Sequence, residues 1–86
     1  MHLIIAFLKI IMEEEAQYYK DQILKSCRAQ DKNQTGKVTA KDFKSISWTC
    51  LEPLAITTNE FYNLLRETHA QDGYVAYETE VPKLPL

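Results

Sequence analysis

Residues 31–43 read DKNQTGKVTAKDF, a polar stretch with one glycine and one valine, and this stretch decides the fold. A hard divalent cation such as Ca²⁺ takes about six to eight oxygen ligands, which a twelve-residue loop supplies from positions 1, 3, 5, 7, 9 and 12. Counting from Asp31, each of those positions offers an oxygen atom, the seventh through its backbone carbonyl. The candidate metal ligands are Asp31, Asn33, Thr35, Lys37, Thr39 and Asp42.

The other positions of this loop have the properties that such a loop needs. Gly36 is at position six, where the chain must turn sharply in a left-handed conformation. Val38, at position eight, suits a short strand, and Phe43 follows the last ligand as the first core residue of a helix. With amphipathic segments on both sides, residues 31–43 resemble the EF-hand family. The resemblance implies a helix–loop–helix unit that can hold Ca²⁺ and that usually occurs in pairs.

Helices are predicted on both sides of the loop. The stretch 12–30 has no glycine or proline, and its apolar residues recur at helical spacing. These residues are Met12, Ala16, Tyr19, Ile23 and Cys27. A second helix is expected over residues 40–51. Thr57 and Glu60 have the spacing of a capping box, which predicts a third helix that runs to about residue 68.

A second loop, residues 68–79, begins 37 residues after the first. Gly73 is at its sixth position and Val75 at its eighth, so the resemblance implies that Val38 and Val75 pair in a two-stranded antiparallel bridge. The ligands are missing, however, because positions 1, 3 and 12 hold Thr68, Ala70 and Thr79. We therefore expect the second loop to be structural and to hold no Ca²⁺.

The first loop is expected to bind its ion weakly. It has two carboxylates, Asp31 and Asp42, and ligand charge tunes affinity. Position 12 is Asp where the family usually has Glu, so the loop must contract before both oxygens reach the ion. Three positive charges also lie close by, on Lys32, Lys37 and Lys41. The sequence leaves three alternatives open: Ca²⁺, the smaller Mg²⁺, or a loop that keeps its fold without an ion.

Length and composition exclude several classes of protein. The 86 residues allow one small domain, and a net charge of -2 with scattered lysines and arginines gives no reason to expect nucleic acid. No nucleophile–base cluster or phosphate-binding loop indicates an enzyme. The prediction is an all-α paired EF-hand domain over residues 12–81, with a helical extension at 1–11 and a proline-containing tail at 82–86.

The N-terminal run LIIAFLKIIM, residues 3–12, is apolar but too short to cross a bilayer, which takes about 20 residues. Lys9 interrupts the run and Glu13, Glu14 and Glu15 follow it, which argues against a signal peptide and against contact with anionic lipid. We expect a helical extension that packs on its own domain or on a partner. Two cysteines without a secretory signal favour reduced thiols and a cytoplasmic location.

The end of the chain is too short for the fourth helix of a paired EF-hand, because Pro82 allows at most one turn over residues 78–81. The apolar surface that this helix would cover must then be covered by the N-terminal run or by a helix of another protein. Aromatic residues are enriched where proteins grip each other. The candidate partner-binding residues are Phe43, Ile46, Trp48, Leu51 and Tyr62.

Two functional hypotheses follow. In the first, the protein is a calcium-binding regulatory or adaptor module, whose 31–42 loop senses the ion and alters binding of a partner helix. In the second, it is a constitutive structural subunit of a cytoskeletal, axonemal or ciliary assembly, and the EF-hand fold is a metal-free scaffold. Asp42 and Thr79 favour the second hypothesis, whereas the intact ligands at the start of the first loop favour the first.

Overall fold

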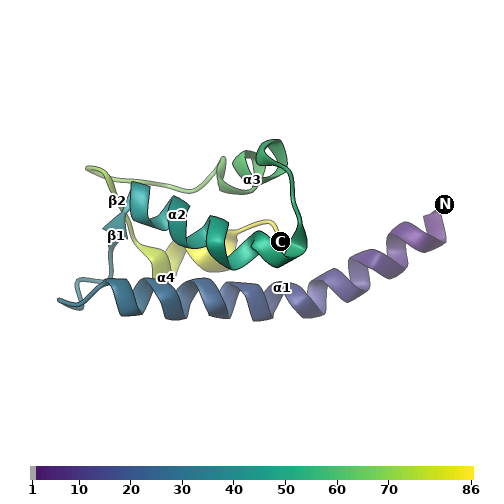
Figure 1. The fold of residues 1–86 in the computed structure, drawn as a ribbon, viewed down its shortest axis with the longest axis horizontal. Coiled ribbons are helices and arrows are strands. Elements are labelled where there is room, and N and C mark those ends of the chain that lie inside the picture. The colour runs from purple at the N-terminus through teal and green to yellow at the C-terminus, as the bar shows by residue number, and fades with distance from the viewer. Residues whose placement is uncertain (1) are drawn as a thin grey trace.

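The computed structural model describes residues 2–86, with side chains from Glu15 onward, and is mostly helical (Figure 1). The α-helices of this part are α1 (His2–Gln30), α2 (Ala40–Leu51), α3 (Thr58–Leu65) and α4 (Tyr77–Glu80). Two short strands, β1 (Val38–Thr39) and β2 (Tyr74–Val75), form an antiparallel sheet. Single 3-10 turns, η1 (Glu52–Leu54) and η2 (Val81–Lys83), follow α2 and α4. The predicted helical fold with a small antiparallel sheet is thus confirmed.

The first helix joins the predicted 12–30 segment and the predicted helical extension into one continuous helix, because no glycine or proline interrupts residues 2–30. Its C-terminal half packs along the rest of the domain, where Ala16, Ile23 and Cys27 are buried. Its N-terminal half extends beyond the other elements (Figure 1). The apolar run therefore does not fold back over the core in this structure.

The strands join the two loops in the predicted register. Val38 pairs with Val75, and Thr39 pairs with Tyr74. Since both valines are at the eighth position of their loops, the alignment of the two loops is confirmed. Gly36 and Gly73, at the sixth positions, have φ values of +79° and +82°, a region that residues with a Cβ rarely adopt.

Local sequence signals fix where the helices begin. The Thr39 hydroxyl accepts a hydrogen bond from the Asp42 N–H at the start of α2. Thr57 and Glu60 form the predicted capping box at the start of α3, with each side chain bonded to the other residue's backbone N–H. Helix α3 ends at Leu65, a little earlier than predicted.

The core lies between the C-terminal half of α1, α2, α3 and the short last helix. Its members are Ile23, Cys27, Val38, Phe43, Leu51, Phe61, Val75, Tyr77, Val81 and Leu84. Helix α4 is one turn long, as Pro82 led us to expect. The residues after it are nevertheless buried, because Val81 and Leu84 pack into the core. The chain's own end thus covers part of the surface that the sequence had assigned to a partner or to the N-terminal run.

Candidate functional site

The carboxylate of Asp31 is the centre of the first loop, and four donors bind it. Oδ1 accepts hydrogen bonds from the Thr35 N–H (3.0 Å) and the Thr35 hydroxyl (2.9 Å). Oδ2 accepts from the Gly36 N–H (2.7 Å) and from the Tyr77 hydroxyl (2.8 Å), which comes from the second loop. Desolvation by burial would raise the pKa of Asp31, but these hydrogen bonds outweigh it and lower the pKa from 3.8 to about 2.

Three of the six predicted ligand oxygens converge in this loop. The Thr35 Oγ1 lies 2.9 Å from Asp31 Oδ1 and 3.1 Å from the Lys37 carbonyl oxygen. The Thr39 hydroxyl instead caps α2, and no hydrogen bond of the described side chains joins Asn33 or the Asp42 carboxylate to the cluster. Three of the six candidate ligands, Asp31, Thr35 and Lys37, therefore lie together, with Thr35 within hydrogen-bonding distance of the other two.

The second loop is held by internal hydrogen bonds. Glu80, which directly follows the twelfth position, is buried, and its Oε1 accepts a hydrogen bond of 2.8 Å from the His69 N–H. Tyr77, at the tenth position, reaches across to Asp31. The resemblance to the EF-hand family accounts for an aromatic residue at the tenth position, but neither its contact with Asp31 nor the role of Glu80 was predicted. The signal that could have drawn attention to Glu80 is its position, because it is a carboxylate directly after a second loop that lacks its cation ligands.

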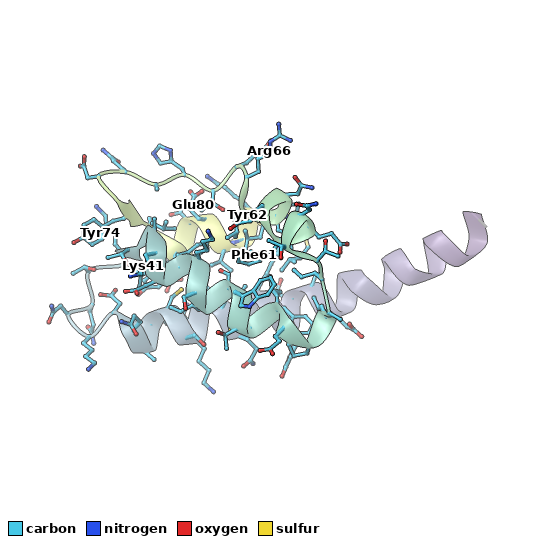
Figure 2. The ribbon with its side chains drawn as sticks, turned by 45° about the horizontal axis from the view of Figure 1, so that its top comes forward. Lys41, Phe61, Tyr62, Arg66, Tyr74 and Glu80 are labelled. Atoms are coloured by element: carbon cyan, nitrogen blue, oxygen red, sulfur yellow. The ribbon has the colours of Figure 1, made fainter. Side chains whose placement is uncertain are left out.

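Two of the exposed aromatic residues, Trp48 and Tyr62, lie where α2 meets α3. We call Lys41, Lys44, Trp48, Phe61 and Tyr62, which line the groove there, the aromatic face. Figure 2 labels Lys41 on α2 and Phe61 and Tyr62 on α3, which border the same groove of about 370 Å³. The Trp48 ring packs edge-on against Phe61, with centroids 4.9 Å apart. The Lys44 Nζ lies 3.1 Å from the Tyr62 hydroxyl oxygen and 4.5 Å from the centre of its ring. The face is apolar, with a basic edge.

The predicted partner-binding residues divide into two groups. Trp48 and Tyr62 are 41 % and 51 % exposed, so a partner can reach them. Phe43 and Leu51 are only 2 % and 1 % exposed, because the core side of α2 buries them. Ile46 is half-buried and packs against the same core. Phe43 and Leu51 are therefore core residues here, which corrects their assignment to a partner-binding surface.

A comparison of the chain with known protein families, with curated proteins and with solved structures finds no match. In the described part of the chain, no three His, Cys, Asp or Glu side chains gather as a possible metal centre. None of the helices described here has the length and apolar character needed to cross a membrane. The function must therefore be inferred from the first loop and the aromatic face.

The hydrogen bond between Tyr77 and Asp31 predicts a late tyrosine titration. This bond, with burial second, raises the pKa of Tyr77 from 10.0 to about 12. A raised pKa stabilises the fold fully below pH 10 and loses this contribution as the pH rises to about 12. Phenolate absorbance should show a late step from Tyr77 as the pH approaches about 12. Tyr77→Phe should lack this late step and Tyr62→Phe should keep it; a single common titration in the folded wild type would contradict the bond.

Proposed function

We propose that the chain is a two-loop module of the EF-hand type that binds a divalent cation weakly in its first loop and a protein helix on its aromatic face. The observation that carries the proposal is the convergence of oxygens from Asp31, Thr35 and Lys37 in a loop of matching geometry. Its glycine has positive φ at position six, and its valine pairs with the second loop at position eight. The proposal includes no catalytic role and no nucleic-acid partner.

The first loop has donors that suit a hard cation, because carboxylate, hydroxyl and carbonyl oxygens are the ligands of Ca²⁺ and Mg²⁺. Asp31, Thr35 and the Lys37 carbonyl would hold the ion on one side. Asn33, Thr39 and Asp42 would complete its coordination. A bound cation would supply positive charge between Asp31 and Asp42, joining the start of the loop to α2. With two carboxylates, we expect binding to be weak and Mg²⁺ to compete with Ca²⁺.

A second candidate function is a metal-free scaffold, a constitutive subunit of a cytoskeletal or ciliary assembly. One observation favours it: four internal donors already satisfy Asp31, including the Tyr77 hydroxyl from the other loop. A cation must displace or share these hydrogen bonds, so part of its binding energy is offset. The regulatory or adaptor role and the scaffold role differ in whether the loop binds an ion at cellular concentrations.

Position 12 separates the two functions. Asp42 is half-buried, and its carboxylate has no hydrogen bond to any side chain or backbone group among the described residues, so changes at this position should leave the fold intact. If the loop binds Ca²⁺, Asp42→Asn should weaken binding at least about tenfold, because it removes one of two carboxylates. Asp42→Glu, one methylene longer, should strengthen binding by a similar factor. Calorimetry and amide shifts of residues 31–42 during Ca²⁺ and Mg²⁺ titrations measure both effects.

Asp72→Asn is the matched control, because it removes a carboxylate from the second loop at a position with φ +55°, which Asn tolerates. It should leave the affinity unchanged. If neither ion shifts the amides of residues 31–42 at millimolar concentration, and if Asp42→Glu does not create binding, the calcium-binding function fails. The metal-free scaffold would then be the remaining function.

A further inference from the structure

The chain contains both an apolar segment that extends away from the domain and an apolar groove that is open to solvent. The segment is the N-terminal half of α1, with the apolar run of residues 3–12 followed by Glu13, Glu14 and Glu15 (Figure 1). The groove is the aromatic face between α2 and α3. Because α1 is one continuous helix that leads away from the domain, this segment cannot reach the groove of its own chain.

We propose that the N-terminal half of α1 of a second copy docks in the aromatic face, so that two copies exchange these segments reciprocally. The inference rests on the proposed helix-binding role of this face but not on cation binding. A reciprocal exchange gives two identical contacts related by a two-fold axis, which closes the assembly as a dimer. The docked segment would bury the exposed part of the Trp48 ring.

Charge complementarity supports this occupant over an arbitrary helix. The groove is apolar around Trp48 and Phe61 and basic at Lys41 and Lys44. The segment has the matching composition, apolar first and acidic afterwards. An anionic lipid surface would repel the three glutamates, whereas Lys41 and Lys44 would attract them. A helix from this same chain therefore satisfies both parts of the groove.

The spacing along the two helices also agrees. On α2, Lys41 precedes Trp48 by seven residues, which is about 10 Å along a helix. On α1, Phe7 precedes Glu14 by the same number. If the segment lies antiparallel to α2, its apolar run lies over the Trp48 end of the groove. The glutamates then lie opposite the two lysines at the other end. The proposed dimer therefore has a defined orientation.

The test uses the full chain and measures mass and tryptophan fluorescence over a range of concentrations. Trp48 is the single tryptophan, so its emission reports on this groove. We expect the mass to rise from 10.0 kDa to twice that value as concentration increases, with a parallel blue shift of the emission. Lys41→Glu with Lys44→Glu should weaken association at least about tenfold. Adding Glu13→Lys and Glu14→Lys to that variant should restore it.

Lys25→Glu with Lys32→Glu is the matched control, because it changes the net charge equally at two exposed lysines outside the groove. It should associate like the wild type. A chain that stays monomeric at millimolar concentration, or whose dimer is insensitive to the Lys41 and Lys44 reversals, overturns the exchange. A designed amphipathic helix, with leucines on one face and glutamates on the other, distinguishes failure of the dimer from failure of helix binding at the aromatic face. If it shifts the Trp48 emission of a monomer, helix binding stands without self-association; if it does not, both fail.

Discussion

Phe43→Ala should destabilise the folded chain by about 3–5 kcal/mol, which is a large share of the roughly 5–15 kcal/mol that stabilises a typical domain. Phe43 is 2 % exposed and packs in the core on the inner side of α2, so its removal leaves a cavity as well as lost contacts. Urea unfolding followed by far-ultraviolet circular dichroism measures the change. The loop pattern predicts Phe43 as the first core residue of α2, and a large loss agrees with that role rather than with its other assignment to a partner-binding surface.

Trp48→Ala is the matched variant, and its loss of stability is compared with that of Phe43→Ala. Trp48 is on the outer side of the same helix and is 41 % exposed, so we expect a cost of about 1 kcal/mol or slightly more, from its contact with Phe61. The same change should abolish binding at the aromatic face. Equal stability losses in the two variants would contradict the division of α2 into a core side and a binding side.

Tyr77→Ala should also destabilise the fold by about 3–5 kcal/mol, because the ring is buried and its hydroxyl joins the second loop to Asp31. Tyr77→Phe keeps the ring and removes the hydroxyl, so it should cost only about 1 kcal/mol. Asp31 retains its three hydrogen bonds from Thr35 and Gly36 in that variant. Equilibrium unfolding of both variants separates the packing of the ring from the hydrogen bond between the loops.

Tyr74→Ala is the control for this pair. Tyr74 lies three residues earlier on the same loop and is 49 % exposed, so its ring contributes little to the core. The change should cost much less than Tyr77→Ala. A similar loss in both variants would mean that the second loop depends on aromatic residues in general and not on the Tyr77 ring in the core.

Much of the local structure could be predicted because each signal acts over a few residues. Gly36 and Gly73 mark the positive-φ turns, and Thr57 with Glu60 marks the start of α3. The pairing of Val38 with Val75 followed from aligning the two loops, since matching positions of similar loops meet at a shared strand pair. The candidate ligands followed from the positions of the first loop that can offer an oxygen atom to a cation.

Other features depended on contacts between residues far apart in the chain, which no spacing rule predicts. The loop pattern predicted Phe43 as a core residue, but only packing showed that Leu51 is buried as well while Trp48 on the same helix stays exposed. The hydrogen bond from Tyr77 to Asp31 spans 46 residues, and Val81 is buried in a turn that packs against α1.

The sequence by itself determined the two loops, their glycines, the helix starts and the two-residue strand pair, because backbone conformation and capping are local. The tertiary structure decided three other things: that Leu51 of α2 is buried in the core, how Tyr77 completes the hydrogen bonding of Asp31, and that the chain's own end packs into the core. The physical reason is that burial is a property of the assembled elements. Whether an apolar side chain belongs to the core or to the surface depends on whether another element covers it.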